Sequence, residues 1–205
     1  MSQFAQWLDH ALYDFDHLFL SFFHWLYEVG DGFFTPFFSF ITFFCNGGWS
    51  MLAMGAILLV FPKTRKAGFA VLLAVAFGGL ITNQTIKPLV LRYRPFQTWE
   101  EYRLWWEAVG GLEVGEFSFP SGHTTSAMAG ITALVISHRK KWMPLSFIFV
   151  VLMGMSRNYL MVHYPTDIIG GVISGGVAAI LAVIATHYIW IGVPKLYQKI
   201  KTKKA

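Results

Sequence analysis

The stretch MSRNYLMVHYPTDIIGG, residues 155–171, decides the fold, because it places ionisable side chains between two long apolar runs. Arg157, His163 and Asp167 lie here, and charged groups at such a junction are costly and usually functional. Pro165 is expected to break the helix and let the chain turn back, so that Arg157 and His163 face one pocket. Asp167 then falls in the first turn of the next helix, where its carboxylate can reach a ring nitrogen of His163.

This stretch alone allows two interpretations of the His–Asp spacing. A histidine held by an aspartate is the base or nucleophile half of many hydrolytic sites. The alternative is a hydrogen-bonded histidine near a helix end, followed by an aspartate that caps the next helix. The rest of the sequence has to separate these two interpretations.

The composition indicates one membrane domain that covers residues 1–205. The sequence is 55% hydrophobic and only 13% charged, whereas about a quarter of the residues of a soluble domain are charged. The net charge of +5 is concentrated in short loops and in the tail, which favours an orientation signal over a nucleic-acid surface. Cys45 is the only cysteine, so neither an internal disulfide nor a thiolate zinc cluster is expected.

The apolar runs predict an all-α, polytopic membrane bundle of about six helices. Residues 1–47 form an N-terminal region, in which the aromatic and acidic stretch 3–28 predicts a helix at the membrane interface or a partial span. Residues 48–191 form the core bundle and 192–205 a basic tail. A crossing needs about 20 apolar residues, and the five clear runs are 49–61 with the residues before it, 67–86, 121–137, 144–162 and 168–191.

The basic clusters predict how the chain is oriented in the cell membrane. Residues 63–66, residues 139–141 and the tail are rich in Lys and Arg and fall at alternate ends of the spans. Such clusters face the cytoplasm. The segment 87–119 and the turn around His163 are therefore expected together on the external side.

A second group of cations follows the run 67–86, in the sequence KPLVLRYRP. Lys87 and Arg94 suit an anion clamp, because Arg offers forked donors and Lys a point charge. Arg92 lies between them and is expected as a fourth cation at the rim of such a site. The alternative is a set of interfacial anchors that reach lipid headgroups.

The sequence FSFPSGHTTSA, residues 117–127, resembles the start of a helix at the same membrane face. Pro120 suits the first helical position. Ser121 and Gly122 would then offer free backbone N–H groups, to which phosphate binds well. His123 follows directly, and the alternative is a plain helix start with a surface histidine.

Together these segments describe a site for a tetrahedral oxyanion, with one histidine to attack and another to handle protons. Phosphoryl transfer depends mainly on positioning and charge stabilisation. The paired carboxylates of a two-metal hydrolase are missing, so no metal or other cofactor is expected. The residues of this site are Lys87, Arg94, Ser121, Gly122, His123, Arg157, His163 and Asp167.

The segments KPLVLRYRP, PSGH and SRNYLMVHYPTD resemble the three signature motifs of the type 2 phosphatidic acid phosphatase family of integral membrane lipid phosphatases. Every defining position and internal spacing matches, over roughly residues 48–190. The resemblance implies a six-helix fold and metal-independent dephosphorylation through a phosphohistidine. It makes His163 the nucleophile, Asp167 its orienting partner and His123 the acid that then activates water. It makes the phosphate cradle Lys87, Arg94, Arg157, Ser121 and Gly122.

The expected function is therefore hydrolysis of a lipid phosphate, and undecaprenyl diphosphate is the favoured substrate. Phosphatidylglycerol phosphate and phosphatidic acid are the alternatives. A lipid phosphotransferase and a non-catalytic lipid-phosphate binder or translocator are rivals of other classes. The Trp-rich segment 98–116 is expected either to anchor the external loop in the interface or to act as a lid over the pocket.

Overall fold

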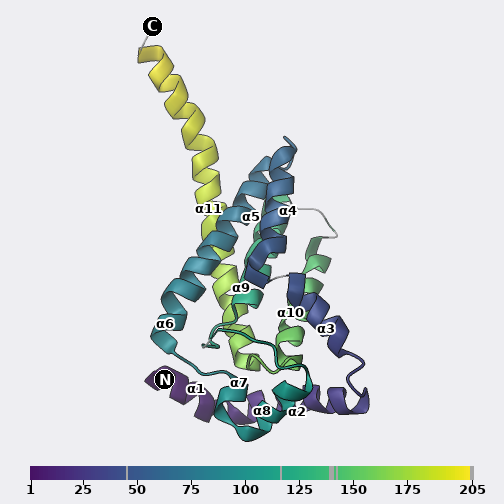
Figure 1. Ribbon diagram of the computed structural model, residues 1–205. Helices are drawn as coiled ribbons and strands as arrows, with labels where there is room; N and C mark the ends of the chain where they lie inside the picture. Colours follow the sequence, from purple (N-terminus) through teal and green to yellow (C-terminus); the bar gives the residue numbers. More distant parts are fainter. Residues whose placement is uncertain (45, 116, 139–140, 142, 204–205) are drawn as a thin grey trace.

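The computed structural model describes residues 1–44, 46–115, 117–138, 141 and 143–203 (Figure 1). Cys45, Arg139 and Lys140 lie outside the described residues, as do the side chains of the basic tail. Within the described part the regular secondary structure is helical, apart from one isolated β-bridge between Tyr93 and Phe117. The all-α prediction is confirmed.

Helices α5, α9 and α11 pack against one another and form the centre of the bundle (Figure 1). Small residues allow this close approach: alanines of all three helices are fully buried between them, and a Cβ on Gly175 would lie 2.6 Å from the backbone oxygen of Thr125. The helices of the bundle are α3 (Thr35–Phe44), α4 (Trp49–Val60), α5 (Arg65–Gly79), α9 (Gly122–His138), α10 (Phe147–Tyr159) and α11 (Pro165–Lys203).

Two helical stretches of the described chain are long and apolar enough to cross a membrane, Arg65–Val90 and Pro165–Gly192. The first consists of α5, the π-helical turn η2 (Leu80–Ile86) and α6 (Lys87–Val90). Helices α3 and α4 make a third span only if the pair is counted together across its 48° bend. The chain is a membrane protein, and the five clear spans expected from the sequence stay a prediction.

Two of the helices in the expected spans are shorter than a membrane crossing needs. Helix α9 has 17 residues and α10 has 13, which is less than the roughly 20 that a crossing needs. Helix α9 begins only at Gly122, and a separate 3-10 turn precedes α10. The apolar run 144–162 therefore overestimates the length of α10, whereas α9 is as long as its apolar run 121–137.

The N-terminal region lies across one end of the bundle, beside the ends of α6 and α10 (Figure 1). The single helix expected over residues 3–28 is divided at Leu12 into α1 (Gln3–Ala11) and α2 (Tyr13–Val29). The short helices α7 (Pro95–Thr98) and α8 (Glu100–Ala108) lie at the same end.

The Trp-rich segment is attached to α2. Tyr102 is buried and its hydroxyl is hydrogen-bonded to Nδ1 of His17 at 2.8 Å. The ring of Trp105 stacks on His24 with the centroids 4.3 Å apart. These contacts attach the segment to α2, and both its anchoring in the membrane interface and its action as a lid stay predictions.

Candidate active site

A cavity of about 450 Å³ opens at the end of the bundle that α1, α2 and α8 cover. Three separate segments of the chain contribute to its wall, as the spacing of the polar residues predicts. The predicted site residues that line it are Lys87, Arg94, Gly122, His123, Arg157 and His163. The other two, Ser121 and Asp167, are fully buried behind this wall.

His163 lies in the turn between α10 and α11, where Pro165 begins the second helix as expected. Its Nδ1 lies 3.3 Å from Oδ2 of Asp167, and its Nε2 lies 3.3 Å from Nη1 of Arg94. A guanidinium can only donate, so Nε2 must be the acceptor and the ring proton belongs on Nδ1. Nε2 is therefore unprotonated, and its lone pair accepts from Arg94 at the wall of the cavity.

The surroundings of His163 favour its neutral form. The side chain is almost completely buried, and burial is the main cause that lowers the pKa of the imidazole well below its usual value. The positive charges of Arg94, Arg157 and Lys87 lower it further. A neutral imidazole with an unprotonated Nε2 is the form that can attack phosphorus, once Nε2 exchanges its contact with Arg94 for the substrate.

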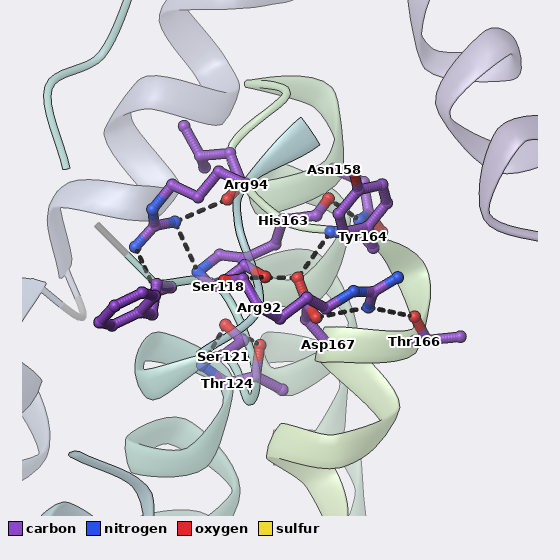
Figure 2. A network of polar contacts seen from close by, with 12 residues as sticks. Arg92, Arg94, Ser118, Ser121, Thr124, Asn158, His163, Tyr164, Thr166 and Asp167 are labelled. Carbon is purple, nitrogen blue, oxygen red and sulfur yellow. Dashed lines mark hydrogen bonds and ion pairs between the residues drawn. The ribbon is translucent and has the colours of Figure 1, made fainter. Parts of the chain in front are cut away.

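Asp167 stands in the first turn of α11, with no exposed surface. In addition to His163, its Oδ2 accepts the backbone N–H of Tyr164 at 2.9 Å. Its Oδ1 accepts from Nη1 of Arg92 at 2.7 Å, and its backbone oxygen accepts the N–H of Ser121 at 3.0 Å (Figure 2). The carboxylate is thus held on both oxygens.

Arg94 is held in place by backbone carbonyls. Its guanidinium donates to Val162 at 2.6 Å, to Phe117 at 3.2 Å and to Gly115 (Figure 2). Burial lowers the pKa of Arg94 to about 10, and the charge of Asp167 partly offsets this. The side chain stays charged at neutral pH and faces the cavity without a carboxylate partner in direct contact among the described residues.

Arg157 is the least compensated of the cations. It is 1% exposed, and its Nε has no hydrogen-bond partner in the described part of the chain. Its Nη1 lies 3.3 Å from the hydroxyl of Thr42. A buried donor without a partner is rare because it costs free energy. An anion in the cavity would provide that partner.

The start of α9 differs from the expectation. The helix begins at Gly122, so Pro120 is not its first residue. Ser121 does not offer a free N–H, because that group donates to Asp167, and its hydroxyl accepts from the hydroxyl of Thr124 at 3.1 Å. The prediction that Ser121 presents its backbone to phosphate is therefore wrong, and Gly122 and His123 are the residues of this turn that reach the cavity.

Arg92 is not a cation at the rim, and this prediction is also wrong. It is fully buried, and its guanidinium pairs with Asp9 at 2.8 Å, Asp16 at 2.8 Å and Asp167 at 2.7 Å. Burial tends to lower the pKa of Arg92, but the three carboxylates outweigh it and raise the pKa above its usual value. Its charge is compensated within the protein.

The structure adds Asn83 to the wall of the cavity. It lies in the π-helical turn η2, four residues before Lys87 and four after Gly79, which also line the cavity. Residues at this spacing lie on one helix face. The polar sequence TNQT inside the apolar run 67–86 was the signal for it. Among the described residues, no group of His, Cys, Asp and Glu side chains is arranged to hold a metal.

The fold and the site define a helical membrane protein with a cationic pocket around a His–Asp pair. A family model, the PAP2 superfamily, matches residues 67–191. The chain belongs to the PAP2 superfamily, which confirms the resemblance seen in the three motifs. Helices α1 and α2 precede the matched region.

Curated relatives share part of their length with this chain. A lipid A 4'-phosphatase of Bacteroides thetaiotaomicron is 32% identical over 122 residues, which cover 58% of this chain and 53% of the relative. An undecaprenyl-diphosphatase of Sulfolobus acidocaldarius is 30% identical over 130 residues, which cover 62% and 59%. The match thus spans little more than half the length of each relative.

Among solved structures, the chain is similar to LpxE of Aquifex aeolicus. The TM-score is 0.61 at 23% sequence identity, over 74% of this chain and 86% of the other. This similarity concerns the fold. It covers the greater part of both chains, so a solved structure has a similar overall arrangement of helices.

The unpaired Nε of Arg157 predicts that the cavity binds a phosphate-like anion. Arg157→Gln should weaken the binding of orthovanadate by about 10- to 100-fold, because a hydrogen bond to a charged group contributes about 1.5–3 kcal/mol. Titration calorimetry of the purified protein in detergent measures this. Arg103→Gln, on the exposed surface of α8, is the matched control and should leave the affinity unchanged. Equal affinities for the two variants would contradict the prediction.

Proposed function

We propose that this protein is a lipid phosphatase that transfers the phosphoryl group of its substrate to Nε2 of His163 and then to water. The observation that carries this proposal is the pair of contacts that His163 makes with Asp167 and Arg94, from which its tautomer follows. Its proton is held on Nδ1 by Asp167, and its Nε2 lone pair faces a cavity lined by Lys87, Arg94 and Arg157. A nucleophile and the charges that a phosphate needs are thus in one place.

In the first step Nε2 of His163 attacks phosphorus, and the bond to the leaving oxygen breaks as His123 gives that oxygen a proton. The three cations stabilise the charge of the transferring group. Asp167 stabilises the positive imidazole ring that forms. A bound phosphate also supplies the negative charge that lets His123 hold a proton among these cations.

In the second step His123, now neutral, takes a proton from water, and the water oxygen attacks phosphorus. The P–N bond breaks and inorganic phosphate leaves, so that His163 regains its neutral form. Proton transfer of this kind typically contributes 10²–10⁴-fold to a rate. The side chains that take part in these two steps line the cavity, except for Asp167, which is buried behind its wall, and the proposal includes no metal.

For the substrate we propose a polyprenyl diphosphate, such as undecaprenyl diphosphate. Lys87, Arg94 and Arg157 have no direct carboxylate partner among the described residues, and three such cations suit a diphosphate better than a monophosphate. Phosphate is also a better leaving group than the alkoxide of a monoester. The relative from Sulfolobus acidocaldarius carries the name undecaprenyl-diphosphatase, which supports this choice. Phosphatidylglycerol phosphate and phosphatidic acid are the competing substrates.

The cavity end of the bundle is proposed to face the outside of the cell, with the basic loops inside. With Cys45 replaced, a single cysteine placed at Glu101 on α8 should react with an impermeant thiol reagent on intact cells. A cysteine placed at Lys63 should react only after lysis. Labelling at position 63 but not at position 101 would invert the orientation.

The roles of the two histidines predict different losses. His163→Ala should abolish phosphate release, because the attacking nitrogen is gone. His123→Ala should lower kcat by about 10²–10⁴-fold, as expected for loss of an acid–base group. His187→Ala, on an exposed position of α11, is the control and should behave as wild type. Phosphate release is measured in detergent with and without a chelator, which should make no difference.

Near-normal release by His163→Ala would refute the assignment of the nucleophile. Loss of wild-type activity with chelator, restored by magnesium, would refute the metal-free chemistry. If an added acceptor alcohol receives the phosphoryl group in preference to water, the protein is a phosphotransferase. If phosphate is never released although the lipid binds, it is a binder or translocator.

The proposed substrate predicts that a polyprenyl diphosphate has a higher kcat/KM than phosphatidic acid or phosphatidylglycerol phosphate. The comparison is made on purified protein at matched detergent and lipid fractions, with release of one phosphate per molecule as the readout. A tenfold preference for either monophosphate, about 1.4 kcal/mol in transition-state stabilisation, would exclude this choice of substrate and leave the phosphatase proposal standing.

A further inference from the structure

A chain of buried charged side chains joins the N-terminal helix α2 to the proposed nucleophile. Asp16 is 2% exposed, and its two carboxylate oxygens accept three hydrogen bonds. Oδ2 accepts from Nη2 of Arg92 at 2.8 Å and from the hydroxyl of Thr166 at 2.7 Å. Oδ1 accepts from the backbone N–H of Thr166 at 2.9 Å. Asp16 is thus hydrogen-bonded both to Arg92 and to Thr166, the residue that precedes Asp167.

Arg92 connects Asp16 to Asp167, because its guanidinium is hydrogen-bonded to both carboxylates. Its Nη1 donates to Oδ1 of Asp167 at 2.7 Å, on the side away from His163 (Figure 2). The same nitrogen donates to the hydroxyl of Thr166 at 2.7 Å, and Nε donates to Asp9 at 2.8 Å. Because the guanidinium is rigid and planar, fixing Nη2 and Nε also fixes where Nη1 meets Asp167.

A contribution to the stability of the fold does not by itself explain why these charged side chains are buried together. Buried ion pairs contribute little net stability, since removing charges from water costs about as much as their attraction returns. Here three carboxylates surround one guanidinium, so the negative charges are in excess. What the arrangement does provide is a fixed position for the carboxylate that orients His163, and misplacement by about 1 Å can cost 10²-fold in rate.

We propose that Asp16 is a positioning residue of the reaction, which acts through Arg92 to hold Asp167 where it orients Nδ1 of His163. The inference rests on the proposed role of the His163–Asp167 pair. Asp16 lies outside residues 67–191, the part of the chain that the family model matches. The N-terminal region, which carries none of the three motifs, therefore completes the site.

Asp16→Asn tests this with little change of volume. Asparagine has one acceptor oxygen, so its NH₂ group must face a donor of Arg92 or Thr166. We expect kcat to fall at least tenfold while KM changes less than twofold, because Asp16 does not line the substrate cavity. Asp14→Asn, an exposed acidic residue two positions earlier on α2, is the matched control and should retain wild-type kcat.

A double-mutant cycle separates positioning from general stability. If Asp16 acts through Asp167, then Asp16→Asn should lower kcat less than twofold in the Asp167→Asn background. A fall as large as in wild type would mean that the two residues act independently, which would overturn the proposal. Melting temperatures in detergent are recorded for each variant, so that kcat is compared between folded proteins.

A second variant covers the case in which Asp16→Asn does not fold. Asp9→Asn removes a single contact with Nε of Arg92, from a side chain that is 26% exposed. It should lower kcat by a few fold, again without effect in the Asp167→Asn background. If Asp16→Asn does not fold and Asp9→Asn has wild-type kcat, the proposal is overturned.

Two failures can be told apart. If Asp167→Asn keeps wild-type kcat, the proposed chemistry of the His163–Asp167 pair is wrong, and the role of Asp16 is wrong with it. If Asp167→Asn is impaired while Asp16→Asn behaves as Asp14→Asn does, only the positioning role of Asp16 is wrong.

Discussion

The carboxyl group and backbone of Asp167 are the point where the separate parts of the site meet. Its Oδ2 accepts from His163, its Oδ1 from Arg92 and its backbone oxygen from the N–H of Ser121. The segments 87–95, 120–123 and 156–167 are therefore joined by one residue. Because Asp167 is completely buried, water does not compete for these bonds, and a change at any of them is expected to displace the others.

The buried cations fall into two groups, which differ in whether carboxylates of the protein compensate their charge. Arg92 has three carboxylate partners, and its charge is used inside the fold. Arg94 and Arg157 face the cavity; Arg94 is held mainly by neutral carbonyl groups, and the Nε of Arg157 has no partner in the part of the chain that the structure describes. Leaving charges uncompensated is costly in an interior. An anion that enters the cavity would offset this cost in free energy. The pattern of charges therefore supports a phosphate substrate.

Spacing in the sequence was enough to predict His163, Asp167 and the cations of the cavity, because short motifs set their separations. It could not predict the contact of Asp16 with Arg92, since the two residues are 76 positions apart and only the folded chain brings them together. The use of the Ser121 N–H inside the fold was missed for the same reason. The length of α10 was overestimated because helix starts and ends depend on local capping and turns, which apolar length does not reveal, and the number of spans stays a prediction.

The central claim is that phosphoryl transfer passes through Nε2 of His163, and trapping the intermediate tests it most directly. Protein with the His123→Ala change is mixed with substrate labelled on its terminal phosphate and quenched within milliseconds to seconds. Peptide mapping should find an acid-labile, base-stable phosphoryl group on the peptide that contains His163, because hydrolysis is slowed more than attack. Product formation without any labelled protein, or with the label on another residue, would contradict the account.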